Sequence, residues 1–91
     1  MVVIKPSTRA EAKYMAVFEN PKKTVHFGAA GYEDYTTHGD EERKKSYLAR
    51  HKPRENWDDP RTAGSLSRWI LWNKKSLNAS IRDFKNRFPR E

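Results

Sequence analysis

The densest apolar cluster of the chain spans residues 69–72, where two tryptophans flank an isoleucine and a leucine in an otherwise strongly polar sequence. Leu66, Trp69 and Ile70 recur at the i, i+3 and i+4 spacing of one helix face, which predicts a helix over residues 63–73. The leucine and the second tryptophan fall on other sides of that helix. A helix that is apolar on several sides is either clamped between other elements or presents a patch to a partner.

A second apolar stripe predicts a helix over residues 77–88. Its members recur at spacings of four, three and four residues: Leu77, Ile81, Phe84 and Phe88. Ser76 is a suitable N-cap and Pro89 ends the pattern. Thr62 is the corresponding cap for the tryptophan-rich helix.

A third helix is predicted over residues 40–52, and its apolar face is narrow. Asp40 is a favourable N-cap, and acidic residues in the first turn are followed by basic residues toward the C-terminal end, which suits the helix dipole. Pro53 ends the helix. Because only Tyr47 and Leu48 form a clear apolar face, we expect this helix to lie on the surface.

The preceding part of the chain favours strands. Residues 12–19 suit a strand, with Tyr14, Ala16 and Phe18 on one side and Met15 and Val17 on the other. Residues 20–23 include a proline suited to a turn, and residues 24–27 are rich in β-branched and aromatic residues. This pattern predicts a β-hairpin. The glycines in residues 28–31 then break the sheet, and residues 32–39 are expected to form an irregular connection.

Residues 1–11 show no helical periodicity and contain Pro6, so we assign them to an N-terminal arm with room for a short strand at Val2–Ile4. Such an arm is either a disordered tail or an apolar tip that binds a neighbour. Residues 12–91 are assigned to one small α+β domain, a β-hairpin followed by three short helices. Its core is expected to contain Phe18, Phe27, Tyr47, Trp57, Leu66, Trp69, Ile70, Leu77, Ile81 and Phe84.

Composition narrows the class of protein. Only 35% of the 91 residues are apolar, and no stretch approaches the length of a membrane span. Residues 1–4 are apolar but too short for a signal peptide. The net charge is +7, and residues 57–91 carry eight bases against four acids. This excess favours polyanionic partners, which are nucleic acid or acidic protein or lipid surfaces.

Catalytic chemistry is poorly supported. The three histidines, His26, His38 and His51, lack the spacing of a helical zinc site, and the absence of cysteine removes thiolate ligands and nucleophiles. The neighbouring acids at 33–34 and at 58–59 are typical of turns or arginine partners. We therefore expect no enzymatic activity, no cofactor, no metal and no small-molecule substrate.

The most basic region is the candidate binding surface for a partner or for nucleic acid: Lys74, Lys75, Arg82, Lys85, Arg87 and Arg90. Arginine and lysine on helices suit phosphate contacts, and nearby aromatic rings suit base stacking. However, twelve acids are interspersed along the chain, and no zinc-finger, RNP or KH pattern is present.

Seven short segments, in this order, resemble a family of small uncharacterised proteins of large nucleocytoplasmic DNA viruses, including algal and giant viruses. The segments are Val25-His26-Phe27-Gly28, Tyr32 to Tyr35, Glu42-Arg43-Lys44-Lys45, Ala49-Arg50-His51-Lys52, Glu55-Asn56-Trp57, Thr62-Ala63-Gly64 and Trp69-Ile70-Leu71-Trp72-Asn73. The resemblance runs from about Lys13 to Phe88. Lys75 and Pro53 depart from the pattern, where the family has proline and a basic residue respectively.

The resemblance implies a viral setting and no established activity. It favours a non-enzymatic minor capsid protein or other virion component that binds viral capsid proteins. Such a protein is expected in the virion, and otherwise in the host cytoplasm or virus factory. A nucleic-acid-binding protein that contacts viral DNA through the basic C-terminal helices is the first alternative, and a small enzyme is the second.

Overall fold

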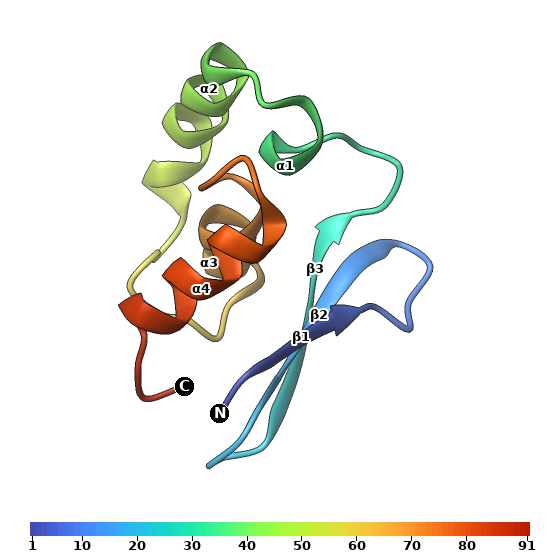
Figure 1. Cartoon of the computed structure of the whole chain (residues 1–91), viewed down its shortest axis with the longest axis vertical. Helices are drawn as coiled ribbons and strands as arrows, with labels where there is room; N and C mark the ends of the chain where they lie inside the picture. Colours follow the sequence, from blue (N-terminus) through green and yellow to red (C-terminus); the bar gives the residue numbers. More distant parts are fainter.

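A computed structural model describes residues 1–91 and shows an antiparallel sheet followed by helices (Figure 1). The sheet contains β1 (Val3–Pro6), β2 (Ala12–Phe18) and β3 (Lys23–Ala29) in the spatial order β1-β2-β3. The β2–β3 pair is the predicted hairpin, with Phe18 opposite Lys23 at its turn. The α+β class is therefore confirmed, with one strand more than the hairpin.

The segment assigned to an N-terminal arm lies in this sheet. β1 pairs with β2 so that Val3 lies opposite Val17 and Pro6 opposite Tyr14. Val2 is only 1% exposed and belongs to the core. The pairing of β1 with β2 thus joins the N-terminal segment to the domain. Pro6 and Lys5 on the edge strand also limit the addition of another strand, because proline lacks an N–H group and a charged edge disfavours pairing.

The helices follow the predicted order, with two short elements in addition. They are α1 (Tyr35–His38), α2 (Glu41–His51), η1 (Lys52–Arg54), α3 (Ala63–Leu66), η2 (Ser67–Leu71) and α4 (Leu77–Arg87). The predicted caps are present at α2, α3 and α4, where the side chains of Asp40, Thr62 and Ser76 accept hydrogen bonds from backbone N–H groups. No helix is long and apolar enough to cross a membrane.

The short helix α1 corrects the irregular connection expected over residues 32–39. Asp34 is its N-cap, and its carboxylate accepts a hydrogen bond from the backbone N–H of Thr36. Thr37 completes a capping box by accepting a hydrogen bond from the Asp34 backbone N–H at 2.9 Å. Gly39 closes the turn with a φ of 62°. These reciprocal bonds stabilise a single helical turn that has no apolar periodicity.

The tryptophan-rich helix is clamped between other elements. It begins as α3 and widens into the π-type turn η2, which packs between α4 and β3. Leu71, expected to point away from the Leu66 face, is instead only 2% exposed. A π-type turn contains more residues than an α-turn, so it rotates the positions after it relative to the preceding face.

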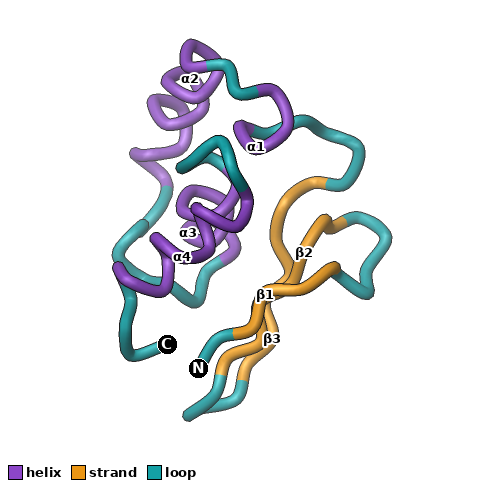
Figure 2. The backbone as a smooth tube through the Cα atoms, viewed as in Figure 1, coloured by secondary structure: helices purple, strands orange, loops and turns teal.

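The core lies between one face of the sheet and the helices α3, η2 and α4 (Figure 2). Five of the predicted core residues are fully buried: Phe18, Phe27, Leu66, Ile70 and Phe84. Three others, Trp69, Leu77 and Ile81, are partly buried against that cluster. Tyr47 and Trp57 are half-buried and stand outside it. Val2, Ala16 and Leu71 complete the cluster and were not predicted.

Candidate functional site

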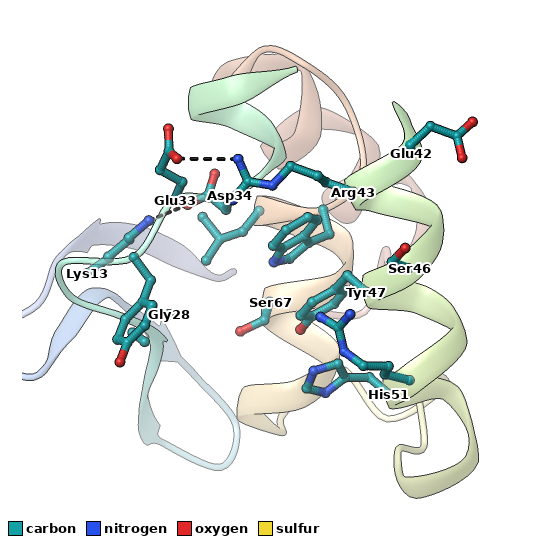
Figure 3. Close-up of a pocket in the computed structure, with 15 residues that line it drawn as sticks. Lys13, Gly28, Glu33, Asp34, Glu42, Arg43, Ser46, Tyr47, His51 and Ser67 are labelled. Carbon is teal, nitrogen blue, oxygen red and sulfur yellow. Dashed lines mark hydrogen bonds and ion pairs between the residues drawn. The ribbon is translucent and has the colours of Figure 1, made fainter. Parts of the chain in front are cut away.

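A groove of about 720 Å³ lies between residues 28–34 on one side and α2 on the other (Figure 3). Leu71 and Trp72 from the end of the tryptophan-rich helix also line it. Pockets of roughly 300–1,000 Å³ are the usual size for small ligands or for an anchoring side chain and its neighbours. Gly28 has a positive φ angle of 80° and no side chain, so β3 can pass close to Leu71 at this point.

Two ion pairs organise the groove. Lys13 on β2 contacts the carboxylate of Asp34 at 2.5 Å, and the side chains are 19% and 4% exposed. Arg43 on α2 reaches across to Glu33 at 3.3 Å, and both of these side chains are well exposed. The first pair is largely removed from water, so it fixes the position of the α1 N-terminus. The second is exposed, and such pairs stabilise only weakly.

A column of rings forms the wall of the groove on the side of α2. Tyr47 stacks on Trp72 with ring centroids 4.2 Å apart and an angle of 4° between the rings. The His51 ring also stacks on Tyr47, with ring centroids 4.2 Å apart. The centroid of the His38 ring lies 5.3 Å from that of Trp72. α2 buries no residue fully, and this stacking attaches it to the end of the tryptophan-rich helix.

The hydroxyl of Tyr47 stays protonated over a wide pH range. Burial raises the pKa of Tyr47 to about 12, the negative charge of Glu55 adds to the rise, and the positive charges of Arg68 and Arg50 oppose it. A protonated phenol is a hydrogen-bond donor, so Tyr47 can donate to a bound acceptor at neutral pH.

The six predicted basic residues differ in their surroundings. Arg82 and Lys85 are exposed on α4 and have no acidic partner, while Lys74 and Lys75 are exposed in the loop before it. Arg90 lies after the helix and, together with Arg87, lines a second hollow of about 300 Å³. Arg87 differs from the other five residues because it also contacts other side chains of the chain.

Arg87 takes part in a cation–aromatic cluster. Its guanidinium lies 3.8 Å from the ring centroid of Trp69 and 3.4 Å from the carboxylate of Asp83. Arg68 lies 4.2 Å from the same indole ring and donates to the backbone oxygen of Trp72 at 2.9 Å. Burial lowers the pKa of Arg68, and the charge of Arg87 adds to this effect. Arg87 is therefore a structural residue as well as a surface charge.

The loop before α3 is tied to the helices through Trp57. Its backbone oxygen accepts hydrogen bonds from the Trp69 indole at 2.9 Å and from the Ser65 hydroxyl at 3.2 Å. The Trp57 side chain is half-buried, and Arg68 lies 5.3 Å from its ring. This loop is thus held against the helices by the backbone oxygen of Trp57 as well as by its ring.

Sequence patterns did not indicate the role of Arg61. Its guanidinium donates to the backbone oxygens of Glu19 and Pro21 at 2.8 and 2.6 Å, and to the Glu91 carboxylate at 2.7 Å. It also lies 4.7 Å from the ring of Phe18. One arginine therefore joins the β2–β3 turn to the C-terminal segment. A lone arginine in a polar loop carries no signal of such distant partners.

The three histidines lie apart and have separate contacts. His26 on β3 shares a hydrogen bond of 2.7 Å with the Ser7 hydroxyl, and His38 accepts from the Asp40 backbone N–H at 2.9 Å. His51 is part of the ring column. No three histidine or carboxylate side chains gather closely enough to hold a metal ion. The groove is lined by hydrogen-bond donors and by aromatic rings.

Comparison with known proteins gives a family. Residues 2–51 match a family of unknown function, DUF5754. The chain belongs to this family. No curated protein and no solved structure matches the chain.

The DUF5754 region covers the sheet, α1 and α2. It therefore contains both rims of the groove, including Gly28, Asp34 and Arg50. The floor residues Ser67, Leu71 and Trp72 come from outside that region. The groove is thus completed only when the family region packs on the following helices.

The structure also brings together the seven short segments singled out in the sequence. Five of the seven contribute residues to the groove: those around Gly28, Tyr32, Glu42, Arg50 and Trp72. The other two meet each other. The Glu55 carboxylate packs against Gly64 so closely that it leaves no room for a β-carbon at that position.

Proposed function

We propose that this member of the DUF5754 family is a non-enzymatic structural protein of a large DNA virus. In this proposal it is a minor capsid protein or another virion component that binds neighbouring capsid proteins. It is found in the virion, and before assembly in the host cytoplasm or virus factory. The resemblance of the seven segments supports the viral setting. The observation that carries the binding role is the distribution of basic residues without acidic partners.

Of the 19 basic residues, five form ion pairs within the chain. The others are dispersed: Lys22 and Lys23 occupy the hairpin turn, Lys74 and Lys75 precede α4, and Arg82 lies on α4. The hairpin turn and the loop before α4 lie far apart along the long axis of the molecule (Figure 1). Dispersed charge suits contacts with acidic surfaces on several sides, as a protein between capsid subunits requires.

Nucleic-acid binding is the second candidate, and one observation favours it. Asn78, Arg82, Lys85 and Asn86 are exposed along one side of α4. These side chains donate hydrogen bonds, and the two bases have no acidic partner. Phosphate oxygens accept such bonds, so this side of α4 could follow a nucleic-acid backbone.

Fractionation of virions tests the preferred role. Purified virions are opened, and empty shells are separated from released DNA. We expect the protein to sediment with the shells at moderate salt. Retention on the DNA, or absence from the virion, would contradict the proposal.

Two charge-reversed variants separate the candidates in vitro. One carries Arg82→Glu and Lys85→Glu on α4, and its matched control carries Lys22→Glu and Lys23→Glu at the hairpin turn. If the protein binds capsid proteins on several sides, each variant should weaken that binding in part, and DNA affinity should be weak at physiological salt. Tight DNA binding lost only in the α4 variant, with a log–log salt slope near −0.9 per phosphate contacted, would favour the alternative.

A further inference from the structure

Some of the polar groups that line the groove have hydrogen-bond or ion-pair partners within the chain, and others have none. Its three carboxylates each have a cationic partner, at 2.5, 3.3 and 3.9 Å. The guanidinium of Arg50 and the hydroxyls of Tyr47 and Ser67 make no hydrogen bond or ion pair within the chain. After internal pairing, the groove therefore offers one free positive charge and hydroxyl donors.

These free groups lie near one another. Tyr47 and Ser67 project toward the space between α2 and residues 28–34 (Figure 3). The positive charge of Arg50 lies close enough to the Tyr47 hydroxyl to act on its ionisation. A planar guanidinium with adjacent hydroxyls matches the geometry of a carboxylate, which only accepts hydrogen bonds when ionised.

We propose that this groove binds a protein segment that carries one acidic side chain beside an apolar one, with the carboxylate paired to Arg50. The proposal deepens and rests on the proposed function, because it names the chemistry of the protein partner. The hydroxyls of Tyr47 and Ser67 donate to the same carboxylate.

The apolar part of the partner follows from the size and lining of the groove. About 720 Å³ is far more than one carboxylate fills. Leu71 and the half-buried Trp72 form an apolar part of the lining beside the free donors. A side chain such as leucine or phenylalanine next to the acid would cover these residues and remove apolar surface from water.

The charges on the rim favour a peptide over a nucleic acid. Three acidic residues also line the groove: Glu33, Asp34 and Glu42. A nucleic-acid backbone carries a charge at every nucleotide, so it would bring further phosphates toward these carboxylates. A peptide with a single acid places its one charge at Arg50 and leaves uncharged atoms elsewhere.

The test uses the whole chain, labelled with ¹⁵N, and the dipeptide acetyl-Asp-Phe-amide as the probe. Its control is acetyl-Asn-Phe-amide, which has nearly the same shape and no charge. At millimolar probe concentration we expect amide shifts confined to residues 28–34, 43–51 and 67–72. We expect about tenfold weaker binding of the control, because a charge-assisted hydrogen bond is lost. Absence of shifts, or shifts elsewhere on the molecule, would overturn the proposal.

Two arginine variants decide whether Arg50 is the partner of the acid. Arg50→Gln should weaken binding of the aspartyl probe about tenfold. Arg54→Gln is the matched control, because Arg54 is also exposed and unpaired but does not line the groove. It should leave the affinity unchanged. Equal losses in both variants would show a general effect of net charge and would refute the assignment.

A third probe, a short oligothymidylate, tests whether the groove binds a nucleic acid. Binding of this probe in the groove, with the same dependence on Arg50, would show that the site takes phosphate and not an acidic peptide. The experiment is independent of virion fractionation. Arg50-dependent peptide binding by a protein absent from shells would refute the virion role alone. Shell association without peptide binding would refute the groove assignment alone.

Discussion

Gly28 should be far less tolerant of a side chain than Gly31, although both have a backbone conformation that favours glycine. Their φ angles are 80° and 84°. An added β-carbon at Gly28 would lie 2.7 Å from a methyl carbon of Leu71 and 3.3 Å from the β-carbon of Lys13. At Gly31 no atom lies within 4 Å of that position. The two alanine substitutions therefore share the backbone cost and differ in the steric cost.

The magnitudes follow from these contacts. A left-handed conformation costs an alanine about 1–2 kcal/mol, and the stiffer unfolded chain returns roughly 0.4–1 kcal/mol. Gly31→Ala should then destabilise by about 1 kcal/mol. Gly28→Ala adds overpacking against a buried leucine, typically about 1–3 kcal/mol, so its total should be about 2–4 kcal/mol.

Urea unfolding followed by tryptophan fluorescence measures both variants. The steric part can be isolated by repeating Gly28→Ala in a Leu71→Ala background, where the clashing methyl is gone. The cost of Gly28→Ala should fall there to that of Gly31→Ala. If the Gly28 and Gly31 variants are equally stable, or if the Leu71→Ala background changes nothing, the close approach of the strand to Leu71 is refuted.

Three further predictions concern single side chains. Trp69→Ala should cost about 3 kcal/mol in urea unfolding, at the lower end for aromatic truncation because the ring is only partly buried; an unchanged midpoint would show that the ring does not contribute to packing. Arg61→Lys should destabilise almost as much as Arg61→Ala, about 2 kcal/mol, because an ammonium cannot reproduce the guanidinium's separate hydrogen bonds; full rescue by lysine would contradict this. Folding raises the pKa of Tyr47 from 10.0 to about 12, so the unfolded state loses the proton first and stability should fall as pH rises through that interval; Tyr47→Phe should remove this part of the pH dependence.

Local patterns predicted the elements that are stabilised locally. The caps Asp40, Thr62 and Ser76 act on backbone groups two or three residues away, so the sequence contains the whole interaction. The alternation that ends in Phe18 places that ring on the buried side of the hairpin. The Asp34 capping box is equally local and could have been recognised from its Asp-x-x-Thr spacing.

Distant pairing explains what the sequence did not show. β1 is short and contains Pro6, and only its partner β2 makes it a strand. Arg61 acts across about 40 residues of sequence on the hairpin turn, a relation without any periodic signature. Tyr47 was expected in the core because it is the main aromatic residue on the narrow face of α2. It is instead covered by Trp72 and His51 in a separate stack.

The groove shows most clearly why a binding site is harder to predict than a helix. Arg43 and Arg50 are seven residues apart on α2, so they lie on nearly the same side of the helix and are equivalent in a sequence pattern. Folding places Glu33 beside Arg43 and leaves Arg50 without an acid. The charge available to a partner is what remains after internal pairing, and that remainder depends on the approach of residues 28–34 to α2. A net charge of +7 therefore favours an anionic partner, whereas the proposed pairing with Arg50 follows from the ion pairs of the folded chain.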